Sequence, residues 1–425
     1  MLLTEAAERR VVAQRVGDVF EAWGYGFVET PVVEEYATLE AGAGSSLEGT
    51  AFRLFDVDGS LLALRPEMTV PIARVVASRL QGQPGPHRLC YVADVFREKE
   101  SLRGEARQFA QAGVEFIGAA GPSADAEVVA ILVEALEGAG LPSFTVGVGT
   151  VAVLRALLAG SGRDVAWQAS VMRAAHERNL VELDRMADDA ALEPAVADAL
   201  RAVPRLRGGA EAIERCRAYA AACGCAGAVD ALADTWRLLE AAGVAERVRV
   251  DFGILRSFDY YTGLIVEAYA PGLGLPLGGG GRYDGVLAAF GAPAPAAGFA
   301  LSVERVQIAL AQQGAAPRVR ELDAVVGGDD PAATFAAARA LRLAGRRVRV
   351  ASAADSAAIR AEADEAGVMG AVLATADGLI APIGANGSPG TAYPLPSAPD
   401  PAAASAPTPA APPAPASATR GGERS

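Results

Sequence analysis

The chain of 425 residues contains only four cysteines and two histidines. The cysteines are Cys90, Cys216, Cys223 and Cys225. They include no Cys-x-x-Cys pair, so the usual ligand spacing of a zinc site is missing and a reducing cytoplasm is the expected location. Neither His87 nor His176 has a sequence neighbour that indicates a metal centre or a nucleophilic triad. We therefore predict no metal and no cofactor, and expect both histidines to be structural.

Long apolar runs are also missing. No run reaches the roughly 20 residues that a transmembrane helix needs, and the first ten residues lack the layout of a signal peptide. Hydrophobic residues still make up 51% of the chain, which is enough for a soluble protein of two or three domains. The formal net charge is −13, whereas tRNA binding depends on a cationic surface, so the charge argues against tRNA as a partner.

The most informative stretch consists of two apolar runs, 88–96 and 109–118, on either side of a charged segment. This pattern is typical of two antiparallel strands joined by a loop. Because side chains alternate between the faces of a strand, Gln111 and Glu115 share one face, and the even-numbered residues form an apolar face. A buried amide and a buried carboxylate need partners. The residues alone leave open whether the partner is a ligand or a pair of structural hydrogen bonds.

This stretch resembles motif 2 of the class II aminoacyl-tRNA synthetases, in the form found in histidyl-tRNA synthetase. The matching residues are Phe96-Arg97 and residues 107–115, which read RQFAQAGVE. Further segments match the same family in the same order. They are LRPEMT at 64–69, LRSFDYYTG at 255–263, GGGRYDG at 279–285, Gly298-Phe299-Ala300 and Glu304-Arg305. The matches span about residues 15–310, so the resemblance is specific for a fold.

The resemblance implies an α+β fold, in which residues 1–318 form a class II synthetase-like antiparallel sheet flanked by helices. A helical insertion is expected at about 152–245, where the sequence is rich in alanine. Residues 319–387 alternate between strand and helix patterns and resemble a shortened anticodon-binding domain. Acids outnumber arginines in this small α/β unit. Residues 388–425 are dominated by Pro, Ala and Ser and are predicted to be a disordered tail.

Local patterns add detail to this outline. Apolar spacing from Glu5 to Trp23 predicts an amphipathic helix, which resembles the dimer-forming motif 1 of the family. The family's Arg-Gly and Pro ahead of this helix are not found. Residues 52–65 read as a hairpin with its turn at Asp58-Gly59. Residues 298–310 are predicted to form a helix.

The resemblance assigns seven residues to histidine binding and none to catalysis. They are Glu67, Arg97, Gln111, Glu115, Arg256, Tyr261 and Tyr283. All seven keep the family's residue types, and Glu67 would bind the amino group of histidine. Read without the resemblance, a carboxylate at the start of a helix can be a helix-terminal charge alone, and tyrosines on a strand can be packing residues.

The motif 2 loop departs from the synthetase pattern at two charged positions. Lys99 stands where the family has a Glu that helps to bind adenine, and Glu105 stands where it has an Arg for the terminal phosphates. A carboxylate beside the triphosphate would repel it. Two unit charges 4 Å apart interact with an energy of roughly 4 kcal/mol at an effective dielectric constant near 20. We therefore expect a pocket that still binds histidine but no longer binds ATP in the manner of a synthetase.

Two kinds of protein share this synthetase body. One is an active histidyl-tRNA synthetase, and the retained Arg256 and Arg305 favour this alternative. The other is the regulatory subunit of short-form ATP phosphoribosyltransferase, which no longer charges tRNA. The altered loop and the shortened, acidic C-terminal unit favour the regulatory subunit. It would form a hetero-oligomer with the short catalytic subunit, dimerise through its core and bind L-histidine as effector in histidine biosynthesis. A third interpretation, a generic amino-acid-binding protein, has no positive feature in the sequence.

Overall fold

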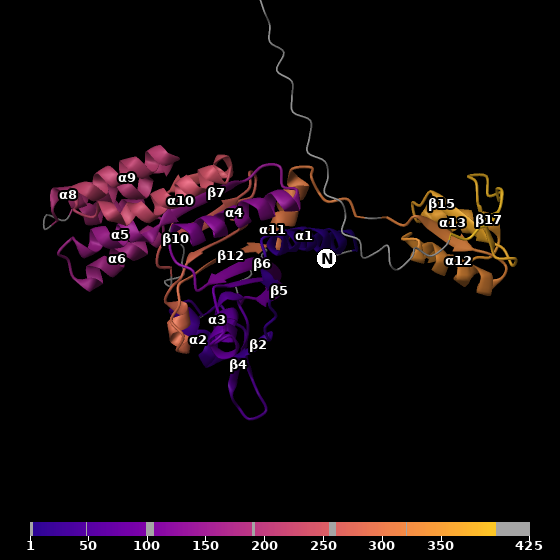
Figure 1. Ribbon diagram of the computed structural model, residues 1–425, viewed down its shortest axis with the longest axis horizontal. Helices are drawn as coiled ribbons and strands as arrows, with labels where there is room; N and C mark the ends of the chain where they lie inside the picture. The colour runs from indigo at the N-terminus through magenta and orange to yellow at the C-terminus, as the bar shows by residue number, and fades with distance from the viewer. Residues whose placement is uncertain are drawn as a thin grey trace, which may run out of the picture. The chain divides into compact units, whose positions relative to one another are not determined.

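The computed structural model describes residues 3–47, 49–98, 106–188, 192–254, 261–319 and 321–396. Contacts divide the chain into two compact units, Met1–Val319 and Arg320–Ser425 (Figure 1). Lys99, Glu105 and Arg256, for which the sequence makes specific predictions, lie outside the described residues, as do residues 397–425. Within the described ranges, no helix is both long and apolar enough to cross a membrane.

The first unit is built on a mixed sheet of nine strands in the order β1-β5-β6-β12-β11-β10-β7-β9-β8. The strands are β1 (Gly26–Phe27), β5 (His87–Phe96), β6 (Gln108–Ile117), β7 (Thr145–Thr150), β8 (Arg207–Gly208), β9 (Val248–Asp251), β10 (Leu264–Tyr269), β11 (Gly278–Arg282) and β12 (Ala296–Ser302). Only the pairs β1–β5 and β7–β9 are parallel in this sheet. The predicted sheet of mainly antiparallel strands, flanked by helices, is confirmed.

Helices cover one face of this sheet and fix the orientation of β6. The helices α1 (Leu3–Ala22), α4 (Pro122–Ala139) and α11 (Val303–Gln312) contribute to one hydrophobic core. Ala110, Ala112 and Val114 of β6 are buried in that same core. Because side chains alternate along a strand, Gln111 and Glu115 face the other side of the sheet, as the sequence predicts.

On that other side lies a smaller subdomain formed by residues 33–79. It contains α2 (Tyr36–Ala43), α3 (Thr69–Arg79) and a three-stranded sheet, β2 (Val33–Glu35), β4 (Leu61–Leu64) and β3 (Arg53–Phe55). Strands β3 and β4 form the predicted hairpin, and Gly59 in its turn has φ +85°, a left-handed conformation that glycine adopts without strain.

Between β7 and β9 the chain is largely helical. The helices are α5 (Val151–Ala159), α6 (Val165–His176), α7 (Leu180–Ala187), α8 (Pro194–Ala202), α9 (Ala210–Ala222) and α10 (Asp230–Ala241). In Figure 1, α5, α6, α8 and α9 form one group. The short strand β8 interrupts the helices and joins the edge of the large sheet beside β9.

The prediction of a helix over residues 298–310 is wrong in its first part. Residues 296–302 form strand β12 between β6 and β11, and α11 begins only at Val303. A strand in the middle of a sheet with both faces covered reads as a continuous apolar run, which periodicity alone does not distinguish from a buried helix. The Ser302 hydroxyl marks the true start of the helix, because it accepts a hydrogen bond from the Arg305 N–H at 3.3 Å.

The second unit is a small α/β sheet in the order β14-β13-β15-β16-β17. Its elements are β13 (Ala324–Gly327), α12 (Pro331–Leu343), β14 (Val348–Val350), α13 (Ser356–Glu365), β15 (Gly370–Ala374), β16 (Leu379–Pro382) and β17 (Tyr393–Pro394). Strand β17 pairs with β16 and therefore extends the sheet beyond residue 387, where the sequence places the end of this unit. Pairing with β17 satisfies backbone groups that an exposed edge strand would leave open.

The close approach of β6 to its neighbours gives a testable stability prediction. A Cβ atom added at Gly113 would collide with the Phe299 carbonyl oxygen and the Tyr91 hydroxyl. We expect Gly113→Ala to lower the free energy of unfolding by roughly 1–3 kcal/mol, measured by urea denaturation. The matched control is Gly285→Ala, where no atom lies within 4 Å of the added Cβ, and it should change the free energy by less than about 0.5 kcal/mol. Equal effects at the two positions would contradict the packing argument.

Candidate functional site

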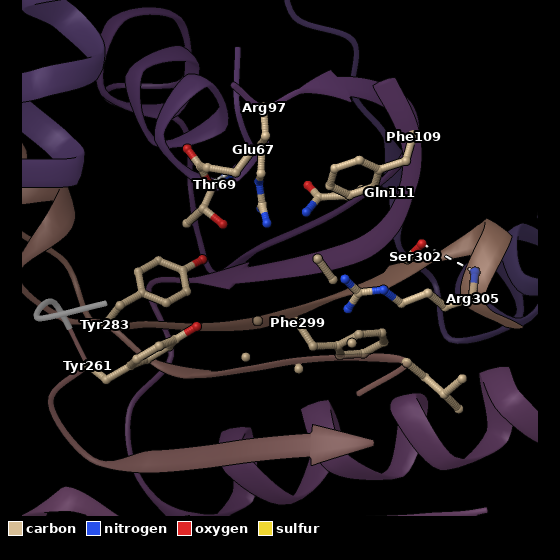
Figure 2. Close-up of a pocket in the computed structure, with 16 residues that line it drawn as sticks. Glu67, Thr69, Arg97, Phe109, Gln111, Tyr261, Tyr283, Phe299, Ser302 and Arg305 are labelled. Carbon is tan, nitrogen blue, oxygen red and sulfur yellow. Dashed lines mark hydrogen bonds between the residues drawn. The ribbon is translucent and has the colours of Figure 1, made fainter. Parts of the chain in front are cut away.

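A pocket lies on the sheet face opposite α1 and α4 and gathers segments that are far apart in the sequence (Figure 2). It is lined by Glu67, Thr69, Arg97, Phe109, Gln111, Tyr261, Leu277, Gly278, Gly279, Gly280, Tyr283, Gly298, Phe299, Ala300, Ser302 and Arg305. Five of the seven predicted histidine-binding residues are in this lining. Of the other two, Glu115 lies behind it and Arg256 falls outside the described residues.

The floor of the pocket is backbone. Strand β11 contributes Gly278, Gly279 and Gly280, and β12 contributes Gly298. A Cβ at Gly280 would collide with the Gly298 carbonyl oxygen, and a Cβ at Gly278 would collide with that of Ala300. Glycine is therefore required here for strand packing, and it also leaves the sheet surface bare for a ligand.

Glu67 has a structural role and a place in the pocket at the same time. Its Oε2 accepts a hydrogen bond from the Thr69 N–H at 2.6 Å, and its Oε1 accepts one from the Val70 N–H at 3.0 Å. The carboxylate thus satisfies two of the unpaired amides at the start of α3. Burial raises the pKa of Glu67, while these two N–H donors and the nearby Arg97 guanidinium act in the opposite direction.

Glu115 is 1% exposed and reaches the pocket only through other side chains. Its carboxylate accepts hydrogen bonds from the Thr69 hydroxyl, at 2.8 Å, and from the Tyr283 hydroxyl. A Cβ at Gly298 would collide with the Glu115 carboxylate, which explains why glycine stands opposite it in β12. These contacts are of the kind that the sequence left open as buried structural hydrogen bonds. A direct contact of Glu115 with histidine stays a prediction.

Gln111 has a buried hydrogen-bond acceptor that faces the pocket. The side chain is 7% exposed, and its Oε1 atom is buried without a hydrogen-bond partner among the described residues. An unsatisfied buried acceptor of this kind costs about 1–3 kcal/mol. In Figure 2 the amide faces the pocket between Arg97 and Phe109. A hydrogen-bond donor on a bound molecule would remove this cost.

Two guanidinium groups, those of Arg97 and Arg305, extend into the pocket from different sides (Figure 2). The Arg97 Nε donates to the Pro66 carbonyl at 2.8 Å, and its guanidinium lies 5.2 Å from the centre of the Phe109 ring. The Arg305 Nη1 donates to the Pro276 carbonyl at 2.8 Å. A backbone carbonyl thus holds each guanidinium group in place, and the Phe109 ring also contacts that of Arg97. The planar fork of arginine suits a carboxylate or a phosphate.

The chemistry of the lining fits a small molecule that carries both charges. Glu67 offers a negative group, the two arginines offer positive groups, and Gln111 and the tyrosines offer neutral hydrogen-bonding groups. In the part of the chain that the structure describes, no three His, Cys, Asp or Glu side chains form a cluster that could hold a metal ion.

Six further side chains that line the pocket were not predicted from the sequence as site residues: Thr69, Phe109, Leu277, Phe299, Ala300 and Ser302. Two of these could have been found. Phe109 shares the strand face of Gln111, and Thr69 follows Glu67 within the LRPEMT segment. Ser302 was hidden by the incorrect helix assignment.

Comparison with known proteins gives a consistent result. A sequence profile described as "Histidyl-tRNA synthetase" matches residues 1–306. The chain is 43% identical over 348 residues to the ATP phosphoribosyltransferase regulatory subunit of Moorella thermoacetica, covering 82% of this chain and 89% of the relative. Among solved structures, an ATP phosphoribosyltransferase regulatory subunit/histidyl-tRNA synthetase from Bacillus halodurans matches with a TM-score of 0.76 and 31% identity, over 86% of this chain and 94% of that one. Histidyl-tRNA synthetase from a Nostoc species matches in fold, with a TM-score of 0.73 at 19% identity, over 93% of this chain and 95% of that one.

The environment of Glu115 predicts a specific dependence of stability on pH. Burial raises the pKa of Glu115 from 4.5 to about 8, while the Tyr283 and Thr69 hydroxyls act in the opposite direction. The folded state therefore holds this proton more tightly than the unfolded state does. The stability that it contributes is fully present below about pH 4.5 and is lost as the pH rises toward 8, on the order of 1.4 kcal/mol per pH unit.

Glu115→Gln removes this titration and keeps the shape of the side chain. Relative to the wild type, the variant should gain in free energy of unfolding as the pH rises from 5 to about 8 and then level off, measured by urea denaturation at each pH. The control is Glu246→Gln at an exposed position. A difference between Glu115→Gln and wild type that does not change with pH would contradict the assignment.

Proposed function

The chain belongs to the histidyl-tRNA synthetase-like family of ATP phosphoribosyltransferase regulatory subunits, and on that premise we propose that it binds a short catalytic subunit, supports its activity and transmits inhibition by L-histidine. The catalytic subunit would join ATP to phosphoribosyl pyrophosphate in the first step of histidine biosynthesis. The present chain would supply regulation and no catalytic residue.

The observation that carries the proposal is the buried Gln111 Oε1 without a partner among the described residues, in a pocket with groups of both charges. Histidine has an ammonium group, a carboxylate and a ring N–H donor. We propose that Glu67 receives the ammonium group and that a guanidinium group receives the carboxylate. An imidazole N–H within reach of Gln111 would supply the missing donor. For inhibition, histidine must favour one arrangement of the assembly over another.

We also propose that two copies associate through the synthetase-like core. Several apolar residues in this part of the unit are exposed: Phe27 of β1, Val33 of β2 with the preceding Val32, and Phe55 and Val57 at the β3–β4 hairpin. Exposed apolar residues of this kind are typical of an interaction surface when they form one patch. Strand β1 also forms one edge of the large sheet.

Reconstitution with a short catalytic subunit tests the proposal. Activity should depend on the present chain and should be inhibited by histidine. Gln111→Met removes the amide and keeps a similar side-chain length, so the histidine concentration for half inhibition should rise about tenfold while assembly is unchanged. Gln14→Met, at an exposed position of α1, is the matched control. If the inhibition curve of Gln111→Met coincides with that of wild type in an assembled complex, this pocket does not hold the regulatory histidine.

The alternative function is an active histidyl-tRNA synthetase, and the position of Arg305 in the pocket lining favours it. Exchange of labelled pyrophosphate into ATP separates the two functions, because only a synthetase forms an adenylate. We expect no histidine-dependent exchange, since Lys99 replaces the glutamate that helps to bind adenine and Glu105 would repel the terminal phosphates. Exchange at ordinary ATP concentrations would assign the chain to the synthetases.

A further inference from the structure

Glu304 of α11 continues the hydrogen-bond ladder of β6 after β12 has ended. The pairing of β6 with β12 ends at Gln111 and Ser302, because α11 begins at Val303. The next amide of β6 that needs an acceptor is that of Ala110. Both carboxylate oxygens of Glu304 lie 3.0 Å from the Ala110 nitrogen. A side chain thus takes the place of a strand at the point where β6 enters the pocket.

The residues on either side of this contact are pocket residues. Phe109 and Gln111 flank Ala110 and face the pocket, and Arg305 follows Glu304 and also lines it. In Figure 2, Phe109, Gln111 and Arg305 surround the same part of the pocket. The Glu304 carboxylate therefore joins the two segments that present these three side chains, without lining the pocket itself.

Arg9 of α1 holds Glu304 from the other side. The Arg9 Nε donates to the Glu304 carboxylate at 2.8 Å, and Arg9 Nη2 donates to the Asp94 carboxylate of β5 at 2.5 Å. The Asp94 carboxylate in turn accepts a hydrogen bond from the side-chain amide of Gln108 at 3.0 Å. The contacts close a ring that returns to β6 at Gln108 and Ala110, so that Phe109 is fixed on both sides.

A second contact ties α1 to α11 next to this ring. The Gln307 side-chain amide donates to the Glu5 carbonyl at 2.9 Å and to the Glu8 carboxylate at 3.1 Å. The first turns of α1 are therefore attached to the helix that carries Arg305.

We propose that the Arg9–Glu304 ion pair is a positioning element for the pocket, and that it links the N-terminal helix α1 to Phe109, Gln111 and Arg305. The inference rests on the proposed function where it concerns histidine. The link itself consists of contacts within the unliganded chain. A partner that displaced the start of α1 would, through this link, change the shape of the pocket without touching its ligand.

Amide hydrogen exchange on the unliganded full chain tests the link directly. Arg9→Gln leaves Glu304 with one partner fewer, so exchange in a peptide covering residues 108–112 should become about three- to tenfold faster. Arg10→Gln is the matched control, because Arg10 is exposed on the same helix. It should leave the exchange of this peptide unchanged, and both variants should leave the exchange of β7 unchanged.

Histidine affinity, measured by titration calorimetry on the same proteins, should be about three- to tenfold weaker for Arg9→Gln and unchanged for Arg10→Gln. Glu304→Gln keeps an oxygen for the Ala110 N–H but removes the charge that Arg9 pairs with. If the two side chains act as one unit, the double variant should be no weaker than the weaker single variant. Should Arg9→Gln fail to fold, Arg9→Lys keeps the charge without the fork and should shift exchange and affinity in the same direction.

The possible outcomes separate the two proposals. Unchanged exchange in residues 108–112 of Arg9→Gln overturns the positioning role, whether or not histidine binds. Faster exchange throughout the sheet, β7 included, also overturns it, because the effect would then be a general loss of stability. Faster exchange confined to residues 108–112, in a wild type that does not bind histidine, supports the link and overturns the proposed function.

Discussion

The pocket depends on three adjacent strands that approach neighbouring groups closely at glycine residues, which have no side chain. Gly113 in β6, Gly298 in β12 and Gly280 in β11 each stand where a Cβ atom would collide with a neighbouring strand or with a buried side chain. Two of these glycines, Gly280 and Gly298, also line the pocket and leave an even floor on which polar groups from distant segments can converge. Strand packing and ligand space are therefore set by the same few residues.

Around this floor, the ionisable side chains are held by contacts that involve no ligand. Backbone amides hold Glu67, two hydroxyls hold Glu115, and backbone carbonyls hold Arg97 and Arg305. Such contacts restrict the rotamers of the pocket residues before anything binds, which lowers the entropy lost on binding. Gln111 differs, because its carbonyl oxygen lacks such a contact in the described chain. Among the described residues, the Gln111 carbonyl oxygen is thus the pocket acceptor that still lacks a hydrogen-bond donor.

Part of this arrangement is readable from the sequence. The period of two along β6 separates the polar face from the core face, and five of the histidine-binding residues that the resemblance implies are in the lining. The period of two along a strand does not indicate how deeply each side chain is buried. Glu115 lies below the lining because Gly298 and Tyr283, more than 150 residues away in the chain, come to cover it. The helix error at 298–310 arises because a strand buried on both faces has no period to read. Arg9 and Glu304 lie at opposite ends of the first unit in the chain. No pattern in the sequence near either residue predicts their contact.

The two roles of Glu67 restrict how this pocket can evolve. Its carboxylate satisfies the first amides of α3 and also lines the pocket, so a substitution there changes the start of the helix and the pocket lining together. Selection for altered ligand response would therefore be steered away from this position and toward Gln111, whose side-chain oxygen supports no other element among the described residues.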